Sequence, residues 1–345
     1  MQAVILAAGK STRTCPLTIT KPKPLLKVAN KTLLEHNLDN LSGIVDEAVL
    51  VVGYKKEMIK EHFKNKYKNI KIKYVWQKQQ LGTANALSVA ESHVKSEFIL
   101  MAGDDIYSGS DMQKCIKHKY SILTAKVKNP RDFGVIVEKN GILADIVEKP
   151  QKFISDLIST SFYVLDNQIF DCLKILKKSE RNELEMPDAI RLLSKNNKIH
   201  CVKSRQWLPV GYPWDLLRAD IALRKNKTFV GNNSKIYGKV KNSSIGDNCI
   251  IKGIVEDSIV MDNSTIGSKS AVKDSVIGEN VCFNGKINSG KNATSMVNNK
   301  KIKINGRFGA VIADNVIADN VMINPGCKIW PGRSISNKTV NEDVA

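Results

Sequence analysis

Aliphatic side chains recur every six residues near the end of this chain. Five follow one another without a break: Val311, Ile317, Ile323, Ile329 and Ile335. One inward-pointing aliphatic side chain per six residues suits a triangular prism, in which each face is a single short strand. Beyond residue 233 there is almost no helical periodicity. The pattern therefore predicts a left-handed parallel β-helix.

Short repeated units earlier in this region support the same prediction. They are Ile245-Gly246-Asp247-Asn248, Ile266-Gly267-Ser268-Lys269 and Ile277-Gly278-Glu279-Asn280. Gly or Asn after many of the aliphatic residues fits tight corners between strands. The stretch 284–307 breaks the rhythm, and we expect it to be a loop that leaves the coil. We place this β-helix domain at residues 226–345, and the polar segment 225–233 is typical of a linker.

Residues 1–225 alternate β-rich runs with amphipathic helical stretches. These patterns predict strands at 3–6, 48–52, 71–75 and 98–101, and helices near 32–41, 58–63, 83–93 and 216–224. The alternation is typical of a Rossmann-like α/β domain with a mainly parallel sheet covered on both faces. Because such sheets bind ligands at the carboxyl ends of their strands, we expect the chemistry in the loops after Leu6 and Met101.

The loop after the first predicted strand has the residue types that bind phosphate groups. It reads Leu6-Ala7-Ala8-Gly9-Lys10-Ser11-Thr12-Arg13, and Pro22-Lys23-Pro24-Leu25 follows about ten residues later. Small residues let backbone N–H groups approach an anion, and Arg13 and Lys23 add two cations. Taken alone, Gly103-Asp104-Asp105 after a later strand would be interpreted as a solvated turn.

Together these motifs resemble the sugar-phosphate nucleotidyltransferase family, and the resemblance extends over most of the chain. Further segments match in order: 77–83, 103–105, 132–135, 147–150, 183–189 and 211–215. The chain is similar to the archaeal two-domain type, in which a left-handed β-helix carrying an amino-sugar acetyltransferase follows the nucleotidyltransferase domain. The resemblance implies transfer of a nucleotidyl group from UTP or dTTP to a sugar 1-phosphate, with release of pyrophosphate. The implied sugar is glucose 1-phosphate or N-acetylglucosamine 1-phosphate.

The resemblance also implies a role for each residue of the site. Nucleotide binding would involve Leu6, Ala7, Ala8, Gly9, Ser11, Thr12, Gln77, Gln80, Gly82 and Thr83. Arg13 and Lys23 would bind the triphosphate, and Asp104 would bind the Mg²⁺ that bridges the phosphates, with Asp105 a turn residue. The sugar and its phosphate would contact Gly134, Glu148, Lys149 and Ser159. A sugar 1-phosphate already carries an anionic nucleophilic oxygen, so the main catalytic task is electrostatic stabilisation.

Three positions depart from the family pattern. Pro209 replaces the aspartate that usually provides a second protein ligand, so Mg²⁺ would depend on Asp104, water and substrate phosphates. Ser159 stands where a sugar-contacting asparagine is usual, and Ser11 where a second glycine is usual. Pro209 keeps open an alternative function, a non-catalytic or regulatory scaffold. The γ and ε subunits of translation initiation factor 2B have the same pair of domains.

The β-helix region has no histidine, because all five histidines of the chain lie in the first 200 residues. Acetyl transfer on such helices uses a histidine base, which by similarity to the archaeal proteins would fall near Ser268. We therefore expect no acetyltransferase activity and interpret the domain as a trimerisation stalk or a regulatory cap. A homotrimer formed through the β-helix is the expected assembly.

The net charge and the spacing of the cysteines indicate which partners and which cellular compartment to expect. The net charge is +19, but the lysines are scattered and no arginines alternate with aromatic residues, which favours phosphate-rich substrates over nucleic acid. Seven cysteines are spread singly, which is typical of a reducing cytoplasm and not of a zinc site or a disulfide framework. The apolar run at 3–8 is too short to span a membrane. We expect a cytoplasmic protein without a membrane partner.

Overall fold

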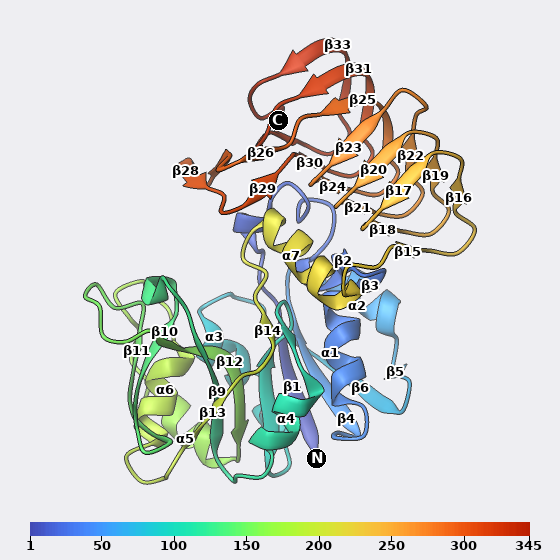
Figure 1. Ribbon diagram of the computed structural model, residues 1–345. Coiled ribbons are helices and arrows are strands. Elements are labelled where there is room, and N and C mark those ends of the chain that lie inside the picture. Colours follow the sequence, from blue (N-terminus) through green and yellow to red (C-terminus); the bar gives the residue numbers. More distant parts are fainter. The chain divides into compact units, whose positions relative to one another are not determined.

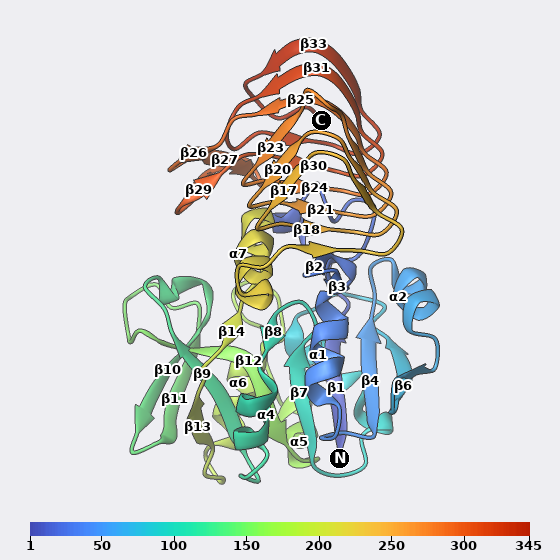
Figure 2. The ribbon, with the colours of Figure 1, turned by 45° about the vertical axis from the view of Figure 1, so that its right-hand side comes forward.

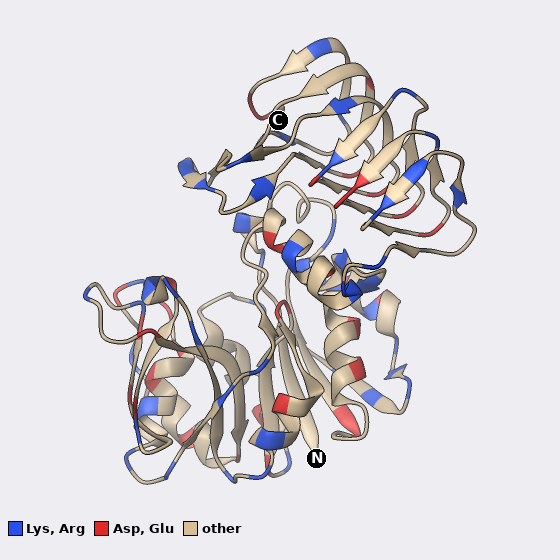
Figure 3. Ribbon diagram, in the orientation of Figure 1, with Lys and Arg blue, Asp and Glu red and all other residues tan.

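The computed structural model describes residues 1–345, which divide into two compact units. The first unit comprises residues 1–9 and 34–207, and the second comprises residues 10–33 and 208–345 (Figure 1). The second unit therefore includes the loop that follows the first strand as well as the C-terminal coils. Lysine and arginine are distributed over both units (Figure 3). None of the helices combines the length and apolar composition that crossing a membrane requires.

A ten-stranded mixed sheet forms the centre of the first unit. Its strands are β1 (Gln2–Ala7), β4 (Glu47–Val52), β5 (Lys66–Tyr67), β6 (Ile70–Trp76), β7 (Phe98–Ala102), β9 (Ser121–Lys126), β10 (Gly134–Lys139), β11 (Ile142–Glu148), β12 (Leu157–Leu165) and β13 (His200–Lys203). The spatial order is β10-β11-β13-β9-β12-β7-β1-β4-β6-β5. The block β7-β1-β4-β6 is parallel, as predicted, and β12 joins it antiparallel to β7.

Helices pack on both faces of this sheet (Figure 1). They are α1 (Leu33–Leu41), α2 (Lys56–Phe63), α3 (Thr83–Ser88), α4 (Gly109–Cys115), α5 (Gln168–Lys174) and α6 (Met186–Leu193). Val4 of β1 lies in the core beside α3, α5 and α6, while the alternate residues Ala3 and Ile5 have 0% exposure. Burial of successive residues shows that β1 is covered on both sides. The predicted helix at 83–93 is shorter than expected, because a tight turn with Ala90 N donating to Leu87 O (2.9 Å) ends it.

A parallel β-helix follows α7 (Pro213–Arg224) in the second unit (Figure 2). One face contains β15 (Phe229–Val230), β18 (Ser244–Ile245), β21 (Ile259–Val260), β24 (Val276–Ile277), β30 (Val311–Ile312) and β32 (Lys328–Ile329). The other two faces contain β16 (Lys235–Ile236), β19 (Ile250–Ile251) and β22 (Thr265–Ile266), and β17 (Lys239–Lys241), β20 (Ile254–Glu256) and β23 (Ala271–Lys273). The longer strands β25 (Cys282–Ile287), β31 (Ile317–Ile323) and β33 (Ser334–Val340) extend the stack. The predicted fold class, a Rossmann-like domain followed by a left-handed parallel β-helix, is confirmed.

Left-handed asparagines form one corner of the β-helix. Asn233, Asn248 and Asn263 have φ of 56–60°, a conformation that asparagine tolerates better than most residues. Their side chains stack from coil to coil, with Nδ2 of one amide 3.2–3.3 Å from Oδ1 of the next. The repeated corner residues therefore satisfy both the backbone geometry and each other's hydrogen bonds.

The aliphatic column differs from the prediction at two positions. Ile317 is 56% exposed, and Ala318 lies inside instead, paired with Phe283 of the preceding coil. A small residue beside a large one keeps the interior close-packed. Ile312 rather than Val311 belongs to the interior cluster, whereas Ile323, Ile329 and Ile335 lie inside as predicted.

Two segments that we expected to be a loop and a linker contain β-strands. Residues 284–287 remain in the coil as part of β25, and the chain leaves it only between β25 and β30. There it forms an antiparallel arm, in which β26 (Gly290–Lys291) pairs with β29 (Arg307–Phe308), and β27 (Thr294–Val297) pairs with β28 (Lys300–Lys303). The predicted linker at 225–233 already contains β15, because Phe229 N donates to Ser243 O (3.0 Å) in the next coil.

Candidate active site

A cavity of about 400 Å³ lies at the carboxyl ends of the parallel strands of the first unit. Its wall is contributed by the ends of β1 and β7, the start of α3, the strands β10 to β12 and the segment before α6. The lining residues are Leu6, Ala8, Gly9, Gln77, Gln80, Gly82, Thr83, Ala86, Leu100, Ala102, Asp104, Gly134, Glu148, Lys149, Ser159, Ser161, Tyr163, Glu183, Glu185, Met186 and Pro187.

Parallel pairing of β1 and β7 places two turns side by side at this cavity. Leu6 pairs with Ala102, and Gly103 N donates to Leu6 O (2.9 Å). A Cβ at Gly103 would lie 3.0 Å from Leu6 O, so glycine permits this close approach. Asp104 follows directly and is half-buried in the cavity wall.

Two glutamine amides in the cavity wall are held by hydrogen bonds. Gln80 Nε2 donates to Ala8 O (2.7 Å) at the end of β1. Gln77 is 4% exposed, and its Nε2 donates to Asn85 Oδ1 (2.9 Å). Amides that are already oriented by the protein lose little freedom when a ligand binds.

Gly82 and Thr83 join the start of α3 to the segment before α6. Gly82 has φ of +106°, and a Cβ there would lie 2.3 Å from Leu184 O. Without that Cβ, Ala84 N can donate to Leu184 O (2.9 Å). Thr83 Oγ1 accepts from Met186 N (3.1 Å), so one hydroxyl serves the N-terminus of α6.

Three carboxylates, Glu148, Glu183 and Glu185, also line the cavity, together with Lys149. Arg181 Nη2 lies 3.1 Å from Glu148 Oε1 and 2.5 Å from Glu185 Oε1. Lys149 Nζ lies 3.5 Å from Glu148 Oε1. Burial and the neighbouring Glu185 carboxylate raise the pKa of Glu183. This part of the wall is polar and contains charges of both signs, and such groups can fix the orientation of a polar ligand.

Gly134 and Ser159 also shape the cavity wall. A Cβ at Gly134 would lie 3.0 Å from Pro187 Cγ, so glycine keeps the wall close to the first turn of α6. Ser159 is 4% exposed, and its Oγ lies 2.8 Å from the Tyr163 hydroxyl. Burial raises the pKa of Tyr163 well above its ordinary value, so the phenol stays protonated.

Most of the predicted site residues of the first unit line this cavity. They are Leu6, Ala8, Gly9, Gln77, Gln80, Gly82, Thr83, Asp104, Gly134, Glu148, Lys149 and Ser159. Ala7 does not line it; this residue is 3% exposed and pairs with Val52 inside the sheet. Sequence analysis missed Tyr163, Glu183 and Glu185. The matching segment 183–189 was the available signal for the two glutamates.

The predicted residues Ser11, Thr12, Arg13 and Lys23 belong to the second unit. Ser11 has φ of 52°, a left-handed conformation that glycine adopts without strain. The Arg13 guanidinium lies 5.6 Å from the centre of the Tyr212 ring, a cation–π contact. Lys23 is 5% exposed, although it carries a charged amine.

Asp105 has contacts of a different kind from Asp104. Its Oδ2 accepts a hydrogen bond from Trp207 Nε1 (3.1 Å). Its backbone oxygen accepts one from Asn37 Nδ2 (2.7 Å) at α1. These bonds hold the turn after β7 to its neighbours, while Asp104 lines the cavity.

An α/β sheet with this cavity at its carboxyl edge, followed by a hexapeptide β-helix, defines a two-domain nucleotidyltransferase. A family model described as nucleotidyl transferase matches residues 2–226, and one described as GlmU-like, C-terminal hexapeptide, matches residues 226–305. The chain belongs to the nucleotidyl transferase family. The resemblance drawn from the sequence motifs is thereby confirmed.

The similarity to known proteins extends over either the whole chain or its first part. The bifunctional protein GlmU of Methanococcus maripaludis is 32% identical over 402 residues, covering 100% of this chain and 95% of that protein. The UTP–glucose-1-phosphate uridylyltransferase AglF of Haloferax volcanii is 36% identical, covering 66% of this chain and 98% of that protein. A UDP-glucose pyrophosphorylase solved with UDP-glucose has a TM-score of 0.60 at 23% identity, covering 66% of this chain and 99% of its own. This last likeness concerns the fold.

Proposed function

We propose that this protein transfers a nucleotidyl group from UTP or dTTP to glucose 1-phosphate or N-acetylglucosamine 1-phosphate and releases pyrophosphate. The observation that carries the proposal is the cavity of the first unit, whose wall contains fixed glutamine amides, Asp104 and a group of charged side chains. Relatives named as a uridylyltransferase and as bifunctional GlmU support the same reaction class.

In this proposal the nucleotide lies along the turns after β1 and β6. The backbone of Leu6 to Gly9 holds the base and ribose, and Gln77 bonds a pyrimidine edge beside Gln80, Gly82 and Thr83. Ser11, Thr12, Arg13 and Lys23 hold the triphosphate, where fixed cations stabilise the charge of the departing pyrophosphate.

The sugar 1-phosphate occupies the part of the cavity lined by Gly134, Glu148, Lys149 and Ser159. Its phosphate oxygen attacks the α-phosphorus, a new P–O bond forms, and the bond to the β-phosphate oxygen breaks. Lys149 screens the approach of the two anions, and Glu148 accepts from sugar hydroxyls. No general base is required, since the attacking oxygen is already ionised.

Asp104 fits a magnesium ion with water and substrate phosphates as its other ligands. Its carboxylate is half-buried at the turn after β7, in the wall of the cavity. Magnesium keeps several waters and needs only one or two carboxylates in phosphate sites, so Pro209 in place of a second aspartate is compatible with binding. When bound, the ion supplies positive charge to the phosphates.

A matrix of four nucleoside triphosphates against sugar 1-phosphates, assayed for pyrophosphate release with Mg²⁺, tests the proposed function. We expect release with UTP or dTTP and a gluco-configured sugar 1-phosphate. Release with no pair would contradict the proposal and favour the non-catalytic scaffold that Pro209 leaves as the alternative.

We further propose that the β-helix does not transfer acetyl groups. The position near Ser268 lies in a groove of about 950 Å³ that contains no histidine and one carboxylate, Asp319. Incubation with acetyl-CoA and glucosamine 1-phosphate is expected to release no coenzyme A above background, in contrast to what the bifunctional names of the relatives suggest. Thiol release that depends on the sugar phosphate would refute this expectation.

A homotrimer formed through the β-helix is also part of the proposal. Ile254 and Met322 expose 40% and 42% of their surface on one face of the β-helix, and Ile317 exposes 56% on another face, so apolar side chains are available to pack against another copy. Light scattering is expected to give three times the chain mass. A monomer, or a trimer that persists when Ile317→Arg and Met322→Arg are combined, would speak against this interface.

We also propose a cytoplasmic location, because all seven cysteines are free thiols, which is typical of a reducing compartment.

A further inference from the structure

Four carboxylates occupy equivalent positions on successive coils of the β-helix. Asp247, Asp262, Glu279 and Asp314 each lie two residues after a strand of the first face, and these strands are paired in register. We name these four residues the acidic ladder. Neighbouring strands lie about 4.8 Å apart, so like charges in such a column destabilise the coil unless cations face them.

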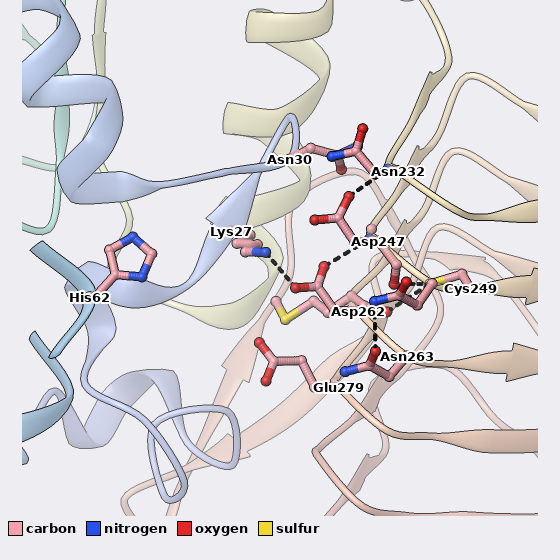
Figure 4. Close-up of polar contacts among 12 residues, drawn as sticks. Lys27, Asn30, His62, Asn232, Asp247, Cys249, Asp262, Asn263 and Glu279 are labelled. Carbon is pink, nitrogen blue, oxygen red and sulfur yellow. Dashed lines mark hydrogen bonds and ion pairs between the residues drawn. The ribbon is translucent and has the colours of Figure 1, made fainter. Parts of the chain in front are cut away.

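One oxygen of each aspartate in the acidic ladder is used within the β-helix. Asp247 Oδ1 accepts from Asn232 N (2.6 Å), and Asp262 Oδ1 accepts from Asp247 N (3.0 Å), as Figure 4 shows. Asp314 Oδ1 accepts from Glu279 N (2.8 Å) in the same way. The second oxygen of Asp262 and of Asp314 is therefore left to bind groups outside the coil.

Those groups come from residues 10–33, far away in the sequence. Lys27 Nζ lies 2.5 Å from Asp262 Oδ2 (Figure 4). Lys21 Nζ forms an ion pair with Glu279 and lies 3.2 Å from Asp314 Oδ2, to which the Thr20 hydroxyl also donates (2.6 Å). The side chains of Lys21 and Asp314 are only 5% and 6% exposed, so theirs is a buried ion pair, and removing one partner of such a pair is costly.

The acidic ladder also keeps Lys27 charged. Burial alone lowers the pKa of this lysine, but the hydrogen bond to Asp262 and the charges of Asp262, Asp247 and Glu279 outweigh it. The pKa of Lys27 is therefore raised. The contact is electrostatically matched, because a column of negative charge faces two lysines.

A second set of contacts fixes the turn at Ala29 and Asn30. Ala29 N donates to Asp220 Oδ1 (2.8 Å), and Asn30 Nδ2 donates to Ile245 O (2.8 Å) in an early coil. The segment 20–30 is thus held at residue 30 by one coil, at Lys27 by the next, and at Thr20 and Lys21 by later coils.

We propose that the acidic ladder positions the loop that carries Lys23 for nucleotidyl transfer. Lys23 stands between Lys21 and Lys27, the two lysines that the ladder holds. Asp262, Glu279 and Asp314 are positioning residues, since they act on the triphosphate only through this loop. The inference rests on the proposed function, and it gives the β-helix a role in the first reaction that needs no acetyl transfer.

Kinetics of the full-length protein test this role with a triple variant, Asp262→Asn, Glu279→Gln and Asp314→Asn. We expect the KM for the nucleoside triphosphate to rise about tenfold or more, with less than about a twofold change in the KM for the sugar 1-phosphate. The matched control is Glu256→Gln, whose carboxylate pairs with Lys239 and Lys273 on another face and is expected to leave both constants unchanged. Exchanging Lys27 and Asp262 for each other keeps this one ion pair with its charges reversed. The exchange should therefore raise the KM for the nucleoside triphosphate less than the triple variant does.

Hydrogen exchange without substrates tests the contact itself. Amides of residues 20–33 should lose protection in the triple variant and, to a smaller extent, in isosteric Asp262→Asn, but not in Glu256→Gln. Unchanged protection would overturn the proposal, as would lost protection with an unchanged KM for the triphosphate. If the unaltered protein released no pyrophosphate, the proposed function would fail, while the exchange result would still show whether the ladder holds the loop.

Discussion

Asp104→Asn is expected to lower the turnover number for nucleotidyl transfer about a hundredfold or more, the scale of removing one key electrostatic group. The change keeps the shape of the side chain and removes its negative charge in the cavity wall. Pro209 stands where a second carboxylate would be usual, so no other protein group assigned to Mg²⁺ can compensate. Pyrophosphate release at saturating substrate and several Mg²⁺ concentrations measures the effect.

Asp105→Asn is the matched control for this prediction. The Asp105 carboxylate accepts from Trp207 Nε1 (3.1 Å), and an amide oxygen can accept the same bond. Its turnover number should remain within a few-fold of the parent. If Asp104→Asn and Asp105→Asn behaved alike, the assignment of the metal to Asp104 would be wrong.

Asp220→Asn is expected to lower the free energy of unfolding of the second unit by about 3–5 kcal/mol, the cost of leaving one charge of a buried pair without its partner. Arg224 Nε lies 2.6 Å from Asp220 Oδ2, and both side chains have 0% exposure. The other acceptors of Arg224 are oxygens of Lys227 and Asn242, which do not neutralise its charge. The shift of the urea unfolding midpoint measures the loss.

Asp145→Asn provides a surface control for the buried pair. Asp145 lies 2.7 Å from Arg191, a similar distance, but the two side chains are 46% and 39% exposed. Solvent screening limits such a pair to about 1 kcal/mol or less. Equal destabilisation by the two substitutions would show that burial of the Asp220–Arg224 pair is not what makes it important.

The folds of both units could be predicted because their signals are local. Alternating strands and helices indicated the parallel block, and the six-residue rhythm indicated the β-helix. The inward position of Ala318 in place of Ile317 could not be predicted, since the spacing of corners varies and the pairing with Phe283 decides which side chain points inward. Likewise, the antiparallel arm between β25 and β30 could not be predicted, because its sequence has no repeat of apolar residues.

The site residues were predicted chiefly from sequence motifs, and site residues outside those motifs were not predicted. Tyr163 lines the cavity through a contact with Ser159, but a lone tyrosine in a strand carries no sequence signal. The grouping of residues 10–33 with the C-terminal coils was equally hidden. It depends on pairs such as Lys27 and Asp262, which are 235 residues apart and belong to no shared pattern.

Because residues 10–33 belong to the second unit, residues 20–30 depend on coils that are synthesised much later than they are. Thr20 and its partner Asp314 are separated by 294 residues, which a ribosome adding about 5–20 residues per second completes in roughly 15–60 s. During that interval the sheet of the first unit can form, whereas residues 20–30 still lack their carboxylate partners. A chain that is terminated within the coils before Asp314 would lack partners of residues 20–30. If the loop acts as proposed, nucleotidyl transfer begins only after the coils up to Asp314 have been made.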